Sequence, residues 1–150
     1  MFRDGAARLL VFRVGSEHFA VPLSDVDEVI DAQPIQRVPD AAATVLGVTS
    51  VRGVLLTVYD PRPVLHVDGS VNAAMLLFGD EGKRAALAID DVFDPVIVAE
   101  EDLLPPPSGV DSDGIVIGVV RRASTLIAVL DTEALFRAAI EISDGEGKRT

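Results

Sequence analysis

Three residues near the middle of the chain could form an acid–base set. Asp60, His66 and Asp68 lie close together in the sequence, and a carboxylate that orients an imidazole is a common arrangement for proton transfer near neutral pH. The sequence has no Gly-x-Ser-x-Gly elbow, His-Glu-x-x-His helix or phosphate-binding glycine loop to accompany them. The three residues therefore support only a rival interpretation, a small ligand-binding or enzymatic β-barrel, and we predict no catalytic residues.

Metal and cofactor chemistry also find little support. The two histidines, His18 and His66, are far apart, and the chain has no cysteine. The acidic clusters Asp90-Asp91 and Glu100-Glu101-Asp102 lack the spacing of a calcium loop. We interpret both clusters as solvated acidic surface, and we predict no metal site and no cofactor.

The dipeptide Arg52-Gly53 is the most distinctive local feature. It separates two apolar β-branched segments, Val48–Val51 and Val54–Tyr59, and a two-residue connection that ends in glycine favours a tight hairpin. Gly53 would be the structural turn residue. Arg52 would either point into solvent or be held ready to bind a carboxylate through two parallel hydrogen bonds.

Short strands separated by turn residues must position these side chains. Apolar segments at Leu9–Val14, His18–Leu23, Ala73–Gly79 and Arg84–Ile89 predict further hairpins. Two short helical segments are expected at Ser24–Ile30 and Ala41–Leu46. A C-terminal helix is expected over roughly 132–142, with Thr132 as its cap.

The order of these signals repeats within the chain. Each half has a hairpin, an acidic step before valine, a Val-Pro or Leu-Pro step, and a Gly-Val strand followed by an arginine and a second strand ending in aspartate. The matching closing segments are Gly47-Val48…Arg52…Asp60 and Gly118-Val119…Arg121…Asp131. The repeat predicts a single domain over 1–150, with two small barrels at roughly 9–68 and 73–135.

Composition restricts the partners. The 24 acidic residues outnumber the 13 basic ones, giving a formal net charge of −11. Nucleic-acid phosphates would repel such a chain, so we predict no nucleic-acid partner. No apolar run approaches the length of a membrane span and no secretory signal is visible, so we predict a soluble, cytoplasmic protein without direct membrane insertion.

The ordered set of segments resembles the CheW-like domain family. The stretch from Gly47 to Arg62 is similar to its signature, which reads roughly Gly-Val-x-Asn-Leu-Arg-Gly, an apolar strand and Asp-Leu-Arg. Ser50-Val51 and Pro61 depart from that pattern. The opening hairpin with Val26–Ile30, the Val38-Pro39 step, the Ala88–Val92 segment and the closing strand and helix also resemble the family over about residues 8–140.

The resemblance implies a fold, a role and a site. The fold would be all-β with short helices, built as two tandem SH3-like five-stranded β-barrels. The role would be a non-enzymatic adaptor of chemotaxis signalling that couples the cytoplasmic tips of methyl-accepting chemoreceptors to the regulatory domain of the histidine kinase CheA. The alternative is a coupling protein of another motility or developmental pathway. The expected receptor-binding groove between the barrels involves Val26, Glu28, Gly47, Arg52 and Val92, although Glu28 and Arg52 could instead pair with each other and shape it.

Overall fold

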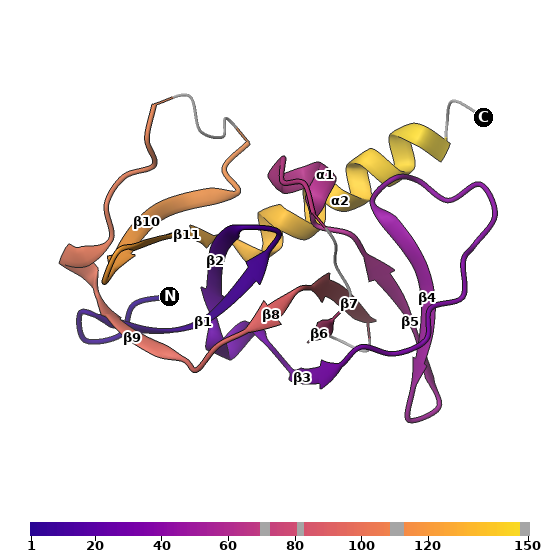
Figure 1. Ribbon diagram of the computed structural model, residues 1–150, viewed down its shortest axis with the longest axis horizontal. Helices are drawn as coiled ribbons and strands as arrows, with labels where there is room; N and C mark the ends of the chain where they lie inside the picture. The colour runs from indigo at the N-terminus through magenta and orange to yellow at the C-terminus, as the bar shows by residue number, and fades with distance from the viewer. Residues whose placement is uncertain (70–72, 81–82, 109–112, 148–150) are drawn as a thin grey trace.

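The computed structural model describes residues 1–69, 73–80, 83–108 and 113–147, which form two lobes of β-sheet (Figure 1). The sheet that we call the terminal lobe contains β1 (Ala6–Val14), β2 (Glu17–Pro22), β8 (Asp91–Val92), β9 (Val96–Ala99), β10 (Val116–Arg122) and β11 (Thr125–Leu130). The sheet that we call the middle lobe contains β3 (Glu28–Asp31), β4 (Val45–Val51), β5 (Val54–Tyr59), β6 (Ala74–Asp80) and β7 (Lys83–Ile89).

Helices are few. The α-helices are α1 (Arg62–Leu65) and α2 (Thr132–Gly147), and the 3₁₀ turns are η1 (Leu23–Asp25) and η2 (Glu100–Asp102). The predicted fold class, all-β with short helices, is confirmed. The helix expected at Ser24–Ile30 is wrong beyond η1 because β3 pairs with β6 there. The helical turn expected at Ala41–Leu46 is also wrong, since β4 begins at Val45.

The strand pairing differs from the predicted division into barrels at 9–68 and 73–135. The β1–β2 hairpin joins the terminal lobe, where β2 runs parallel to β11, and the β6–β7 hairpin joins the middle lobe, where β7 runs parallel to β5. Each half of the repeat therefore contributes its opening hairpin to the lobe built by the other half. The repeat indicates similar units, but it does not say which hairpin pairs with which closing strand.

Both faces of the exchanged hairpins are buried. In β1, Leu9 and Val11 face the interior of the terminal lobe, whereas Leu10 and Phe12 face a core shared by the two lobes. In β6, Met75 and Leu77 similarly face the interior of the middle lobe, while Leu76 and Phe78 face the shared core. Two-sided burial is the reason that these strands read as continuous apolar runs without polar alternation.

A matching bridge completes each lobe. In the middle lobe, the segment after β3 pairs with β4 through two hydrogen bonds between Gln36 and Val48, of 2.8 and 2.9 Å. In the terminal lobe, the segment after β9 pairs with β10 through hydrogen bonds of the same lengths between Leu104 and Val119. Each sheet thus meets itself, which leaves fewer unpaired edge groups exposed to other chains.

A glycine permits each of these bridges. The strand register shifts just before Gly47 in β4 and just before Gly118 in β10. A Cβ on Gly47 would lie 2.2 Å from the Gln36 carbonyl oxygen, and one on Gly118 would lie 2.7 Å from the Leu104 carbonyl oxygen. Only glycine lets the crossing segment approach this closely.

Helix α2 lies against both lobes (Figure 1). Its Phe136 ring contacts Tyr59 and Phe78 edge-on, with centroid distances of 5.8 and 5.0 Å. The Thr44 hydroxyl donates a 3.1 Å hydrogen bond to the Ala139 carbonyl. The predicted C-terminal helix is confirmed and extends to Gly147.

The cap of α2 differs from the sequence prediction. The Asp131 carboxylate accepts a 3.0 Å hydrogen bond from the amide of Ala134, so Asp131 caps the helix. The Thr132 hydroxyl, the predicted cap, is buried and has no hydrogen-bond partner within the part of the chain that the structure describes.

Replacing Gly118 with alanine tests the closure of the terminal lobe. The added methyl group would overlap Leu103 and the Leu104 carbonyl, so we expect Gly118→Ala to lower the free energy of unfolding by about 1–3 kcal/mol in urea denaturation. The matched control is Gly53→Asn, because position 53 has φ +80° with nothing within 4 Å of a Cβ, and asparagine tolerates that conformation. Equal unfolding midpoints for the two variants would contradict this account of the bridge.

Candidate functional site

The β4–β5 turn holds Arg52 in an unusual backbone conformation. Val51 pairs with Val54, so the connection consists of Arg52 and Gly53 alone. Their φ angles are +48° and +80°, the pattern of a type I′ hairpin turn. The predicted tight hairpin is confirmed.

The corresponding turn of the terminal lobe begins with Ala123, at φ +53°. The repeat therefore aligns Arg52 with Ala123, and the match to Arg121 was wrong.

Arg52 forms a bidentate ion pair with Glu28 on β3. Its Nη1 donates a 3.0 Å hydrogen bond to Glu28 Oε1, and its Nη2 donates to Oε2. Strands β3 and β4 stand at opposite ends of the sheet order, so this ion pair ties the β4–β5 turn to the strand at the other end. The sequence analysis left open whether Glu28 and Arg52 pair with each other. In the structure they do.

Charge and solvent both act on this pair. The hydrogen bond from Arg52 lowers the pKa of Glu28 below its ordinary value, and the same contact raises the pKa of Arg52. The Arg52 side chain is 63% exposed and that of Glu28 36% exposed, so solvent screens their attraction. The pair thus orients two charged groups at the surface, where another protein could still reach them.

Val26 and Val92 lie where the two lobes meet. Val26 follows η1, and Val92 is in β8, which pairs with β1 through Phe12. Both valines are partly buried and pack against the core shared by the lobes. They come from segments distant in the sequence, and the shared core brings them to one apolar region.

Gly47 has a different role from the other predicted site residues. It is buried in β4, and its φ of +147° and the close Gln36 carbonyl exclude a side chain. Gly47 therefore shapes the middle lobe where the Gln36 segment crosses β4, and it presents no side chain to a partner.

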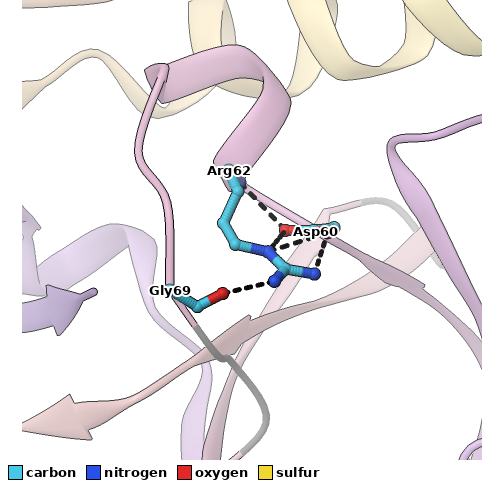
Figure 2. A network of polar contacts seen from close by, with 3 residues as sticks. All are labelled: Asp60, Arg62 and Gly69. Atoms are coloured by element: carbon cyan, nitrogen blue, oxygen red, sulfur yellow. Dashed lines mark hydrogen bonds and ion pairs between the residues drawn. The ribbon is translucent and has the colours of Figure 1, made fainter.

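Sequence reasoning missed a polar network that follows β5. The buried Asp60 carboxylate accepts hydrogen bonds from the Arg62 backbone amide at 2.9 Å, from Nε at 2.9 Å and from Nη2 at 2.7 Å. Nη1 of Arg62 donates to the carbonyl of Gly69, as Figure 2 shows. The spacing of an aspartate and an arginine two residues apart at a strand end was the available signal.

This network bears on the rival acid–base set. Arg62 engages both carboxylate oxygens of Asp60, and His66 ends α1 in a left-handed conformation, with φ +56°. Arg62 thus occupies both oxygens of the carboxylate that the acid–base set would need. Residues 1–69, 73–80, 83–108 and 113–147 contain no group of three or more histidine, cysteine or acidic side chains that could hold a metal ion. No helix within those residues is long and apolar enough to cross a bilayer.

The protein thus belongs to the class of mostly-β proteins built from two sheets. The two sheets exchange hairpins and are joined through a shared apolar core. The principal polar feature of the predicted site is the Arg52–Glu28 ion pair beside an exposed turn.

Comparisons with known proteins agree with that class. The model of the CheW-like domain matches residues 8–139. Among curated proteins, the chain is 26% identical to the chemotaxis protein CheW of Treponema pallidum, covering 89% of this chain and 84% of that protein. It is 27% identical to CheW of Rhizobium meliloti, covering 89% of each. The crystal structure of the scaffolding protein TtCheW from Thermoanaerobacter tengcongensis superposes with a TM-score of 0.74 at 21% identity, covering 87% of this chain and 92% of that one.

The chain belongs to the CheW-like domain family.

Removing Arg52 tests the electrostatic role of the pair. In Arg52→Ala, we expect the pKa of Glu28, followed by carboxyl ¹³C NMR, to rise toward 4.5, its ordinary value. Because the folded pKa is lowered, the contribution of the pair to stability is present above pH 4.5 and is lost as the pH falls through the lowered pKa.

Arg84→Ala is the matched control. The charge of Arg84 has the smallest effect on the pKa of Glu28 and acts without a hydrogen bond. Removing Arg84 should therefore change the Glu28 pKa much less. Equal pKa changes in the two variants would mean that general positive charge, and not the bidentate contact, sets the Glu28 pKa.

Proposed function

We propose that this protein is a non-enzymatic adaptor that couples the cytoplasmic tips of chemoreceptors to the regulatory domain of the histidine kinase CheA, and that it acts in the cytoplasm. Membership of the CheW-like domain family is the observation that supports this proposal most strongly. The matched relatives carry the name chemotaxis protein CheW and are covered over more than four fifths of their length, so the similarity extends through both lobes.

The receptor tip would bind at the junction of the lobes. Partly buried Val26 and Val92 would supply apolar contact there, and Glu28 and Arg52 would supply paired charges on the middle-lobe side. Interfaces of this kind take most of their affinity from a few apolar or arginine anchors. Arg52 suits such a role because its turn and its carboxylate partner fix the guanidinium before binding.

The kinase would bind elsewhere on the lobes. Exposed apolar side chains on the strands of the terminal lobe include Ile97 at 67% exposure and Leu126 at 50%. Such exposed apolar side chains are suited to packing against another protein surface.

The central test is receptor binding by Arg52→Ala. We expect this variant to keep its circular dichroism spectrum and to co-sediment at least about fivefold less with receptor-containing membranes, because truncating an arginine anchor weakens an interface. Binding to the CheA regulatory domain in a pull-down should not change. Arg137→Ala is the matched control, since Arg137 forms a comparable exposed pair with Glu133 on α2. Undiminished receptor binding by Arg52→Ala would contradict the proposed site.

A charge exchange separates two ways in which Arg52 could act. The double variant Glu28→Arg, Arg52→Glu can restore the ion pair with its polarity reversed. If the pair acts only by shaping the middle lobe, receptor co-sedimentation should recover relative to each single variant. If Arg52 binds a receptor carboxylate directly, the double variant should stay defective, which is the outcome that the proposed contact requires.

A further inference from the structure

The loop after α1 touches the tip of the β1–β2 hairpin, and glycines make this approach possible. A Cβ on Gly15, at the hairpin tip, would lie 2.1 Å from the carbonyl oxygen of Asp68 and 2.9 Å from Cγ1 of Val67. A Cβ on Gly69 would lie 2.8 Å from the Cα of Gly15. Both glycines have positive φ angles, +60° and +125°. The backbone of the loop is thus packed directly against the backbone of the terminal lobe.

Arg62 fixes the loop side of this contact. Its guanidinium bridges the buried carboxylate of Asp60, at the end of β5, and the carbonyl of Gly69 (Figure 2). An arginine can make these contacts together because its donors lie in one rigid plane, whereas a lysine has a single ammonium group. The hydrogen bond to Asp60 raises the pKa of Arg62, as expected for a guanidinium held against a buried carboxylate.

The opposite side of the hairpin tip is tied to the strand that carries Val92. The amide of Gly15 donates to the Asp90 carboxylate, and the guanidinium of Arg13 donates a 2.6 Å hydrogen bond to the Gly15 carbonyl. The Asp90 amide donates a 2.9 Å hydrogen bond to the Arg13 carbonyl. Asp90 immediately precedes β8, in which Val92 pairs with Phe12 of β1.

We propose that Arg62 is a positioning residue: by holding the 67–69 loop against Gly15, it fixes the end of β1 and, through Asp90, the place of Val92 at the junction of the lobes. The contacts form a continuous path from β5 of the middle lobe to β8 of the terminal lobe. In this proposal, Arg62 contacts neither the receptor nor the kinase. The effect on receptor binding rests on the proposed function, whereas the structural coupling does not.

The test is amide hydrogen exchange of Arg62→Lys, which keeps the charge and loses the planar fork. We expect the amides of Gly15, Asp90 and Phe93 to exchange about tenfold faster or more, because the contacts that restrain them weaken. The amides of Gln36 and Val48, whose hydrogen bonds close the middle lobe, should keep their rates. A uniform increase across both groups would show general destabilisation and would overturn the positioning role, as would unchanged rates at Gly15 and Phe93.

Receptor binding is the second readout. Co-sedimentation of Arg62→Lys with receptor membranes should weaken by about 2- to 30-fold, the range for residues that act on a site through others. Full binding in spite of faster exchange at Phe93 would overturn the link to Val92. If the wild-type protein binds no receptor, the proposed function fails, while the exchange result still decides the coupling.

Two further variants keep the test independent of one substitution. Gly15→Ala pushes the same contact apart from the hairpin side, so it should raise exchange at Asp90 and Phe93 in the same pattern. Arg137→Lys is the matched control, because it alters an exposed arginine–glutamate pair on α2 outside this path, and it should leave both readouts at wild-type values. A change of equal size in Arg137→Lys would contradict the assignment to Arg62.

Discussion

The two exchanged hairpins must bury both of their faces, and the rest of the architecture depends on this constraint. A sheet with two apolar faces needs a layer on each side. One side of each hairpin is covered by the remaining strands of its lobe, and the other side by the opposite hairpin together with α2. The shared core therefore belongs to neither lobe alone. It includes Phe12 and Val21 from β1 and β2, Leu76 and Ile89 from β6 and β7, and Leu135 from α2.

The candidate site follows from that shared core. Because the hairpins meet face to face, the short segments that enter and leave them are brought to the junction of the lobes. Val26 follows the first hairpin, and Val92 follows the second. Glu28, two residues beyond Val26, begins the strand that receives Arg52. The candidate site thus combines apolar residues positioned by the core with a charged pair positioned by a turn.

Much of this could be predicted from the sequence, and the remainder could not for identifiable reasons. Arg52-Gly53 between apolar strands indicated the tight turn, because a two-residue hairpin connection needs positive φ angles and glycine adopts them readily. The helix expected at Ser24–Ile30 was wrong because a spacing of i, i+3 and i+4 over so few residues also fits an edge strand. The exchange of hairpins could not be predicted, since identical signals suit either pairing. The Arg62 network was missed because Gly69 and Gly15 are brought together only by the folded backbone.

The exchange of hairpins has a consequence for how the chain is made. The strands of the middle lobe, from Glu28 to Ile89, are contiguous, so this lobe can assemble while the ribosome is still adding the following residues. The β1–β2 hairpin emerges before these strands but must wait for β11, which ends at Leu130, before its lobe can close. Pairing across most of the chain length is slow because distant ends must meet. During synthesis, the hairpin that precedes all the other strands is thus among the last to reach its final place.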